Sequence, residues 1–302
     1  MTVDRSCVAT LVARKGQAEL DATSLRAIAE QLRSRASPCW LDPGLAVDLS
    51  FEAPEDGLPR LKVEILGLLA GAAVDVALQP AEGRRKRLFL ADMDSTMIGQ
   101  ECIDELADFA GLKPQVAAIT ERAMRGDIAF EPALRERVAL LEGLPVSVVE
   151  EVLSERIRLT PGGPTLVRTM RAHRSYCALV SGGFTLFTGP IAQRLGFDEH
   201  RSNLLVVDNG HLTGRVAEPI LGRAAKRDRL IELRTALGLD RQATLAVGDG
   251  ANDLAMLAEA GLGVAFRAKP AVAEAAHARI DHGDLETLLF FQGFRRDEFV
   301  AP

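Results

Sequence analysis

The residues best suited to chemistry are two carboxylates, Asp92 and Asp94, in the segment Asp92-Met93-Asp94-Ser95-Thr96. They end the run 88–92, whose length and apolar character are typical of a buried strand. An aspartate can attack phosphorus directly and form an aspartyl-phosphate. A second carboxylate can give a proton to the leaving oxygen and later take one from water. Taken alone, the motif is equally compatible with a polar turn after a strand.

A second acidic pair, Asp249 and Asp253, lies in the segment Gly248-Asp249-Gly250-Ala251-Asn252-Asp253 after the apolar run 245–248. Together with Asp92, these carboxylates would form an oxygen-only site suited to Mg²⁺, and the sequence leaves open which of the pair binds the ion directly. The alternative is a glycine-rich helix start with Asn or Asp caps. A dinucleotide-binding fingerprint is excluded because Asp253 occupies a position that requires glycine.

Two further segments complete a candidate phosphate site. Ser181-Gly182-Gly183 follows the run 177–181 and is expected to open a helix, so that its hydroxyl and N–H groups hold phosphate oxygens. Lys226, one of only six lysines among 36 basic residues, is expected at the start of a helix. A cation there would neutralise an aspartyl nucleophile and a transferring phosphoryl group. Each segment alone is compatible with a turn or a solvated lysine, but the four segments in this order favour phosphoryl transfer.

Composition excludes several other classes of protein. The formal net charge of −6 argues against a nucleic-acid binder held by bulk charge. The four cysteines are far apart and form no Cys-x-x-Cys pair, which excludes a zinc ribbon and indicates a reducing compartment. No cysteine is followed by arginine six residues later, no Arg-His-Gly occurs and no lysine follows a glycine, so neither a cysteine phosphatase, a histidine phosphatase nor a P-loop enzyme is supported. No segment resembles a secretion signal or a membrane span, and we expect a cytoplasmic protein.

The elements that position these residues alternate between strand and helix after about residue 86. Strands are predicted at 88–92, 177–181, 245–248 and 261–266, and helices at 164–172, 184–195, 226–237 and 254–260. This alternation predicts an α/β fold with a doubly wound parallel sheet. Residues 99–160 are helical in pattern throughout, which indicates an inserted helical cap. Residues 204–216, around Asn209-Gly210, are predicted to form a hairpin beside the sheet.

The first 82 residues read as a separate unit. Strands at 7–13, 38–41, 45–51 and 73–78, with helices at 21–35 and 58–69, give the element order of a ferredoxin-like α+β sandwich. A charged linker is expected at 79–87. The order also looks like that of an ACT-type ligand-binding module. We therefore divide the chain into an accessory domain (1–82), a catalytic domain (86–290) with the cap at about 99–160, and a C-terminal tail (291–302).

The four motifs, in this order, resemble those of the haloacid-dehalogenase-like phosphatase superfamily, whose fold is Rossmannoid. The resemblance implies that Asp92 is the nucleophile and Asp94 the general acid/base. It also implies that Asp249 and Asp253 position Mg²⁺ and that Asp94 adds its backbone carbonyl as a ligand. Lys226 would be the catalytic cation, and a four-helix cap is typical of one branch of this superfamily.

Beyond the four motifs, the sequence of about residues 86–290 resembles the phosphoserine phosphatases within that branch. The segments that carry this likeness include Glu101, Ala123-Met124-Arg125-Gly126, Phe130-Glu131, Leu134-Arg135-Glu136-Arg137-Val138, Thr160-Pro161-Gly162 and Val180-Ser181-Gly182-Gly183-Phe184. The likeness implies Mg²⁺-dependent hydrolysis of O-phospho-L-serine to L-serine and phosphate, the last step of serine biosynthesis.

The substrate offers a phosphate, an ammonium and a carboxylate, and the resemblance assigns a residue to each. Glu101 would pair with the ammonium and Arg137, rather than Arg135, would bind the carboxylate bidentately. Ser181, Gly182 and Lys226 would hold the phosphate. Met124 and Phe130 would form an apolar wall, and Asn252 would contact the phosphate or support Asp253.

Two alternatives stay open at this point. One is a related phosphatase or phosphotransferase acting on another small phosphomonoester, such as phosphohomoserine. The other is a protein whose N-terminal domain makes it primarily an amino-acid-responsive regulator. The sequence suggests an amino-acid effector at that domain and a homodimer, and it predicts neither a nucleic-acid nor a membrane partner.

Overall fold

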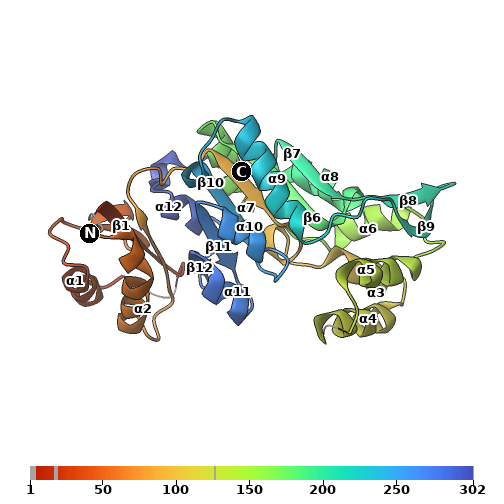
Figure 1. The fold of residues 1–302 in the computed structure, drawn as a ribbon, viewed down its shortest axis with the longest axis horizontal. Helices are drawn as coiled ribbons and strands as arrows, with labels where there is room; N and C mark the ends of the chain where they lie inside the picture. Colours follow the sequence, from red (N-terminus) through yellow and green to blue (C-terminus); the bar gives the residue numbers. More distant parts are fainter. Residues whose placement is uncertain (1–4, 17–19, 126, 302) are drawn as a thin grey trace.

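The structure, a computed structural model, describes residues 5–16, 20–125 and 127–301. It contains a small four-stranded sheet, a larger six-stranded sheet and a helical cap, arranged along the long axis of the molecule (Figure 1). Among the described residues, no helix combines the length and the apolar character that crossing a lipid bilayer requires.

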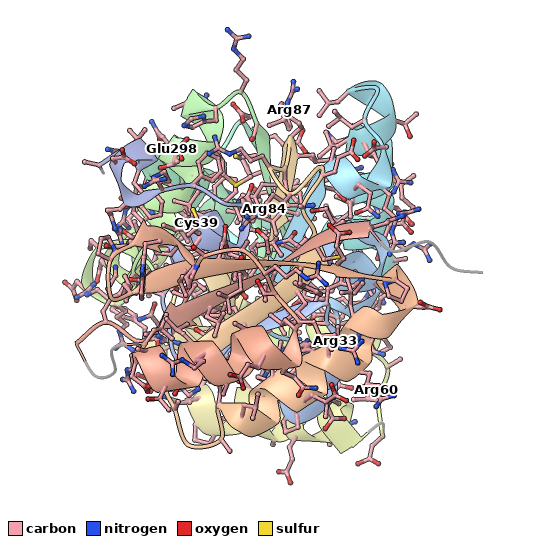
Figure 2. The ribbon with its side chains drawn as sticks, turned by 90° about the vertical axis from the view of Figure 1, so that its left-hand side faces the viewer. Arg33, Cys39, Arg60, Arg84, Arg87 and Glu298 are labelled. Carbon is pink, nitrogen blue, oxygen red and sulfur yellow. The ribbon has the colours of Figure 1, made fainter. Side chains whose placement is uncertain are left out.

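The N-terminal unit has the ferredoxin-like order that the sequence predicts. Its elements are β1 (Arg5–Ala13), α1 (Ala22–Gln31), β2 (Cys39–Asp42), β3 (Ala46–Ala53), α2 (Leu58–Leu68) and β4 (Val74–Pro80). The sheet order is β2-β3-β1-β4, and β1 is antiparallel to both of its neighbours. Both helices cover one face of this sheet (Figure 2), where Ile28 and Ile65 are fully buried. Asp21 caps α1 by accepting hydrogen bonds from two backbone N–H groups of its first turn.

The second sheet is entirely parallel, in the order β12-β11-β10-β5-β6-β7. Its strands are β5 (Leu88–Ala91), β6 (Tyr176–Phe184), β7 (Glu199–Asn203), β10 (Thr244–Gly248), β11 (Leu262–Phe266) and β12 (Ala278–Ile280). The helices that cover it are α7 (Gly163–Ala172), α8 (Thr185–Leu195), α9 (Ala224–Ala236), α10 (Leu254–Glu259), α11 (Pro270–Ala275) and α12 (Thr287–Phe291). Alternate residues of β5 point to opposite faces of the sheet. Phe89 belongs to an apolar cluster with α7, α8 and α12, and Leu90 belongs to a second cluster with α9, α10 and α11. The doubly wound α/β fold is confirmed.

The cap consists of α3 (Cys102–Phe109), α4 (Lys113–Arg125), α5 (Phe130–Ala139) and α6 (Ser147–Glu155). It is joined to the sheet domain by two neighbouring segments, which pair at Ile98 and Leu159. The hairpin β8 (Leu205–Asp208) and β9 (His211–Val216) has positive φ at both Asn209 and Gly210, as the predicted turn requires.

The predicted position of this hairpin is wrong. It does not lie beside the sheet but extends to the cap (Figure 1), where Gly143 N–H donates to Leu212 O over 2.8 Å and Pro145 bridges to His211. The alternation of its residues specifies a hairpin, but its partner is set by contacts with the loop after α5, which lies far away in the sequence.

The predicted linker and tail are both more ordered than their compositions suggest. Gln79 and Pro80 belong to β4, and Lys86 is buried, with its Nζ donating to the carbonyls of Gly83 and Gln242. Phe294 is also buried, although it lies in the predicted tail. Both segments are therefore part of the packed molecule.

Candidate active site

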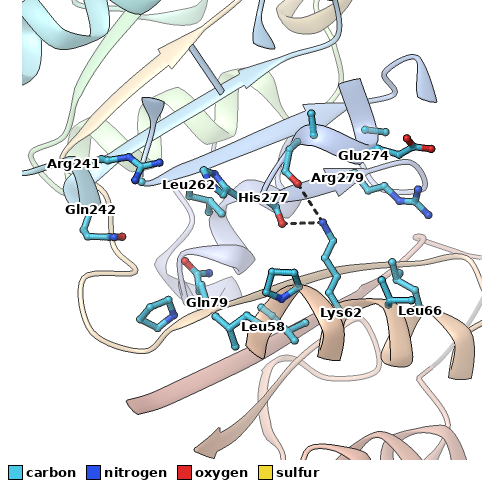
Figure 3. Close-up of a pocket in the computed structure, with 18 residues that line it drawn as sticks. Leu58, Lys62, Leu66, Gln79, Arg241, Gln242, Leu262, Glu274, His277 and Arg279 are labelled. Carbon is cyan, nitrogen blue, oxygen red and sulfur yellow. Dashed lines mark hydrogen bonds between the residues drawn. The ribbon is translucent and has the colours of Figure 1, made fainter. Parts of the chain in front are cut away.

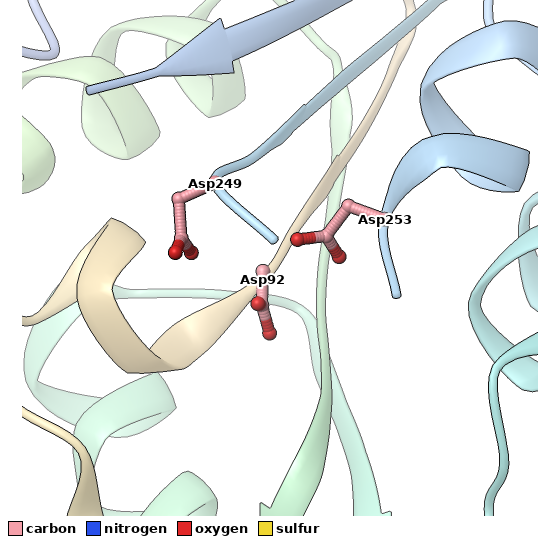
Figure 4. Close-up of side chains that lie close together, drawn as sticks. All are labelled: Asp92, Asp249 and Asp253. Atoms are coloured by element: carbon pink, nitrogen blue, oxygen red, sulfur yellow. The ribbon is translucent and has the colours of Figure 1, made fainter. Parts of the chain in front are cut away.

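The carboxylates of Asp92, Asp249 and Asp253 converge at the C-terminal edge of the parallel sheet (Figure 4). Asp92 follows β5, and Asp249 and Asp253 follow β10, which is the neighbour of β5. One oxygen from each carboxylate lies within 4.8 Å of the others. Strand order thus brings together residues about 160 positions apart, because the C-terminal ends of adjacent parallel strands share one edge.

Lys226, from the first turn of α9, is the cation of this cluster. Its Nζ lies 2.7 Å from Asp92 Oδ1 and 2.6 Å from Asp253 Oδ1, and all three side chains are buried. Burial alone would lower the pKa of Lys226, but the charges of Asp92 and Asp253 outweigh it and raise that pKa above its usual range. Lys226 is therefore a permanent ammonium and not a solvated surface lysine.

One ammonium does not balance the negative charge here. Burial, followed by the charge of Asp253, raises the pKa of Asp92 well above its ordinary value, and burial also raises the pKa of Asp249. Thr96 Oγ1 donates to Asp249 Oδ1 over 2.9 Å and fixes that carboxylate. A divalent cation would relieve the repulsion and reverse these shifts. The oxygen-only donor set fits Mg²⁺.

Asp92 has one engaged oxygen and one available oxygen. Met93 N–H donates to Asp92 Oδ1 over 2.7 Å, and Lys226 contacts the same atom. In the part of the chain that the structure describes, Oδ2 accepts no hydrogen bond. An attacking carboxylate needs this arrangement, in which one oxygen is held in place and the other is available to attack.

The turn after β5 turns Asp94 toward the same site. It is a single wide turn over Met93–Met97, in which Asp94 is extended (φ −65°, ψ 138°) and Ser95 is left-handed (φ 54°). Ser95 is held in this unfavourable conformation because its N–H donates to Gln100 O and its Oγ donates to Glu101 over 2.7 Å. The strained residue thus directly follows Asp94 and reverses the chain after it.

The carboxyl group of Asp94 is hydrogen-bonded at both oxygens. Cys102 N–H donates to Oδ1 over 3.0 Å, and Ser181 Oγ donates to Oδ2 over 3.3 Å. Burial raises the pKa of Asp94 and the Cys102 N–H partly opposes that rise. A raised pKa suits a group that must carry a proton and then lose it. A Cβ at Gly183 would lie 2.9 Å from Asp94 Oδ2, so a larger residue there would displace this carboxylate.

The predicted setting of Ser181-Gly182-Gly183 is wrong in one respect. These residues do not open a helix, because β6 continues through Phe184 and α8 begins at Thr185. A register irregularity between Val180 and Phe184 bends the strand at the glycines. The hydroxyl oxygen of Ser181 accepts a hydrogen bond from Gly183 N–H over 2.8 Å, and this local bond holds the bend in place.

The other predicted phosphate and substrate residues line one small recess. Ser181, Gly182 and Lys226 form it with Phe130 from the cap and Asn252 from the loop before α10. The recess therefore lies between the cap and the sheet domain. Met124 belongs to α4, but its side chain lies outside the described part of the chain.

Glu101 and Arg137 lie on the cap side. Neighbouring protein atoms exclude water from much of the Glu101 carboxylate, although the residue stays at the surface. This exclusion, together with the charge of Asp94, raises the pKa of Glu101 to about 7. Arg137 is half-buried and donates only to Ala133 O and Thr120 Oγ1; no carboxylate among the described residues pairs with it. Arg135, in contrast, pairs with Glu131 and Glu218. Arg137 is the arginine free to bind an added carboxylate.

Sequence reasoning missed Asn203, which is 2% exposed. Its Nδ2 donates to Gly182 O over 2.8 Å and its Oδ1 accepts from Leu221 N–H over 2.7 Å. It therefore ties the bend in β6 to the segment before Lys226. An asparagine in a polar stretch, at the end of a strand that was itself not predicted, gave no signal of this role. Thr96, which orients Asp249, lay inside the first motif.

Comparison with known proteins identifies the family, since residues 89–258 match the haloacid dehalogenase-like hydrolases. The chain belongs to this family. A phosphoserine phosphatase of Mycobacterium tuberculosis is 42% identical over 261 residues, which are 86% of this chain and 64% of that protein. A phosphoserine phosphatase of Albidiferax ferrireducens is 49% identical over 208 residues, 67% of this chain and 88% of that protein.

A solved structure extends the likeness beyond the family domain. A haloacid dehalogenase family hydrolase from Salmonella enterica serovar Typhi superposes with a TM-score of 0.84 at 30% identity, over 95% of this chain and 98% of that one. The N-terminal unit is therefore included in the shared fold. The chain spans less than two thirds of the Mycobacterium relative.

Proposed function

We propose that this haloacid dehalogenase-like hydrolase is a phosphoserine phosphatase, which hydrolyses O-phospho-L-serine to L-serine and phosphate. The observation that carries the proposal is that Arg137, half-buried and without a carboxylate partner among the described residues, lies on the cap side of the site together with the carboxylate of Glu101. A phosphoamino acid carries the complementary carboxylate and ammonium. Two relatives at 42% and 49% identity bear this activity in their names.

Asp92 is the nucleophile in this proposal. Its carboxylate oxygen forms a bond to phosphorus while the bond between phosphorus and the seryl oxygen breaks, and Asp94 gives its proton to that oxygen. L-serine leaves, and an aspartyl-phosphate remains on Asp92. Asp94 then takes a proton from water, whose oxygen attacks phosphorus and releases phosphate. Lys226 offsets the charge of Asp92 throughout.

Asp92, Asp249, Asp253 and the backbone carbonyl of Asp94 would hold Mg²⁺ in this mechanism. The ion supplies Lewis-acid polarisation of the phosphate and relief of carboxylate repulsion. Ser181, Gly182 and Asn252 would contact the phosphate oxygens, and Phe130 with Met124 would exclude water from above.

The test is phosphate release from O-phospho-L-serine by the full chain, with and without Mg²⁺. Activity that requires the ion supports the proposal. No release from phosphoserine in the presence of Mg²⁺ would contradict it. If phosphate is released from phosphohomoserine at a higher kcat/KM, the proposed substrate changes to phosphohomoserine, and the proposed reaction stays the same.

Arg137 sharpens the substrate assignment. Arg137→Ala should raise KM for phosphoserine about 10- to 100-fold, since a bidentate contact with the carboxylate is lost. It should leave the hydrolysis of p-nitrophenyl phosphate, which has no carboxylate, nearly unchanged. Arg135→Ala is the matched control, because Arg135 is already paired with glutamates.

The N-terminal unit, residues 1–82, extends the proposal. We infer an ACT-like domain that binds an amino-acid effector in a cytoplasmic homodimer, from its βαββαβ order and its place in the shared fold. Serine inhibition of the full chain and its mass by light scattering test these two points. A monomer that serine does not inhibit would remove this extension and leave the catalytic proposal intact.

A further inference from the structure

A cavity of about 630 Å³ lies between the N-terminal unit and the catalytic domain, away from the aspartates (Figure 3). Helix α2 forms one side, and the start of β11, the end of α11 and the segment before β12 form the other. Its volume is in the range of small-molecule sites, which are commonly found between domains. The apolar part of its wall includes Leu58, Val63, Leu66, Leu78 and Leu262.

Cations without carboxylate partners line this cavity. Lys62 Nζ donates only to backbone carbonyls, to His277 O over 2.9 Å and to Ala276 O over 3.4 Å (Figure 3). Arg241 likewise donates to the carbonyls of Glu259 and Ala258. Neither has an ion pair within the described residues. Arg279 is neutralised by Asp281, and Glu274 is the one carboxylate of the lining.

These two cations, against a single carboxylate in the lining, make the wall of the cavity electropositive. Lys62 is half-buried, and its pKa is lowered by burial and then by the charge of Arg279, an effect that the charge of Asp281 partly opposes. An anion bound beside Lys62 would remove that penalty, because opposite charge favours the ammonium. An apolar wall next to unpaired cations is complementary to a molecule with an apolar body and one anionic end.

We propose that this cavity is a second ligand site, which binds a small amphipathic carboxylate with its anionic end at Lys62 and its apolar body along α2. The site is separate from the active site, because Arg241 and Leu262 lie at the N-terminal ends of β10 and β11. The aspartates lie at the other ends of the strands. Five strand residues separate the two edges by roughly 16 Å. A ligand here would join the two domains rather than occupy either one.

The test uses three probes with one skeleton and different charge: 4-phenylbutanoate, 4-phenylbutanamide and 4-phenylbutylamine. Calorimetric titration of the full chain should show saturable binding of the carboxylate. The amide should bind at least about 10-fold more weakly and the amine should not bind. Thermal unfolding should show the matching rise in Tm with the carboxylate, since a ligand of the folded state stabilises it.

Variants locate the site. Lys62→Met keeps the length of the side chain and should weaken carboxylate binding about 10-fold, whereas Lys269→Met, an exposed lysine outside the cavity, should not. Ala275→Phe fills the cavity from an exposed position and should abolish binding. Arg137→Ala should leave binding unchanged. Absence of saturable carboxylate binding, equal binding of the amide, or equal binding by Lys62→Met and the parent would overturn the proposal. These readouts do not depend on phosphatase activity.

Discussion

Buried charges are grouped in two places, in the active site and at the junction of the catalytic domain with the N-terminal unit, and the two groups are built differently. In the active site, three clustered aspartates share one ammonium, which contacts Asp92 and Asp253, and an oxygen of Asp92 accepts no hydrogen bond from the described residues. At the junction with the N-terminal unit, Arg84 contacts both oxygens of Asp48, and Thr10 donates to the same carboxylate over 2.7 Å. Arg84, labelled in Figure 2, also donates to the carbonyls of Phe290 and Phe291 in the catalytic domain.

A second carboxylate completes the junction in the same manner. Asp75, 3% exposed, accepts from the backbone N–H groups of Asp281, His282 and Gly283 over 2.7–3.1 Å. Burial raises the pKa of Asp75, and the three N–H groups oppose that rise. At the junction, each buried carboxylate has hydrogen-bond partners that compensate its charge, and these contacts hold the domains together. In the active site, negative charge is in excess, and a carboxylate there stays available to react. The same residue type thus serves stability in one place and chemistry in the other.

The largest expected effect separates these roles in the active site. Asp92→Asn should lower kcat by roughly 10⁴-fold, because the amide is a poor nucleophile. Its free energy of unfolding should be unchanged or higher, since one of several repelling carboxylates is removed. Phosphate release and urea denaturation measure the two quantities. Near-normal turnover in this variant would contradict the nucleophile assignment.

The same substitution at the junction should have the opposite result. Asp48→Asn should lower the free energy of unfolding by about 2–3 kcal/mol, because Arg84 loses its buried partner. The kcat of the folded fraction should stay within a factor of about 3 of the parent value. Denaturation measures the loss of stability, and an assay at low temperature, where the variant is folded, measures kcat. A large loss of kcat with full stability would mean that the junction takes part in catalysis.

Asn203 connects structure to chemistry and should give a smaller, mixed effect. Asn203→Ala should lower kcat/KM about 10-fold and stability by about 1–2 kcal/mol, since Gly182 O and Leu221 N–H both lose a buried partner. Asn203→Asp keeps the acceptor for Leu221 and should be intermediate in kcat/KM. Equal kcat/KM in all three proteins would show that Asn203 is structural only.

Lys86 is a buried cation whose only partners among the described residues are backbone carbonyls, and it gives the smallest expected effect. Burial lowers its pKa to about 8 from 10.5. Between these values the unfolded chain keeps a proton that the folded chain has lost, so stability contributed by this group rises with pH across that window. The gain in the free energy of unfolding is at most about 1.4 kcal/mol per pH unit. Lys86→Met should flatten this part of the profile, measured by urea denaturation from pH 7.5 to 10. An unchanged slope would contradict the lowered pKa.

The sequence predicts the centre of the catalytic domain better than its edges. The strands β5, β6, β10 and β11 were recognised because strands buried on both faces are continuously apolar. Strand β7, with the sequence Glu-His-Arg-Ser-Asn, lies at the sheet edge and carries no such run, and β12 has only three residues. The carboxylate cluster was predictable because Asp92 and Asp249 each follow an apolar run at the same edge of the sheet, and Asp253 comes only four residues after Asp249.

The junction could not be predicted for a different reason. Arg84 lies in an Arg-Arg-Lys-Arg run that resembles a solvated linker, and Asp75 interrupts an apolar stretch without an evident partner. Their partners are more than 30 and 200 residues away, respectively. Pairings at such distances depend on the final packing of two domains, and local patterns do not contain that information.

The shared core of the two domains has a consequence for synthesis on the ribosome. Val12, Leu41, Ala46 and Ala77 of the N-terminal unit belong to the same apolar cluster as Phe290 and Phe291 of α12. The N-terminal sheet is complete once β4 is made, but its second face stays uncovered until α12 emerges roughly 200 residues later. At ordinary elongation rates this interval lasts roughly 10–40 s. Helix α12 therefore covers a sheet face that the strands β1–β4 form much earlier in translation.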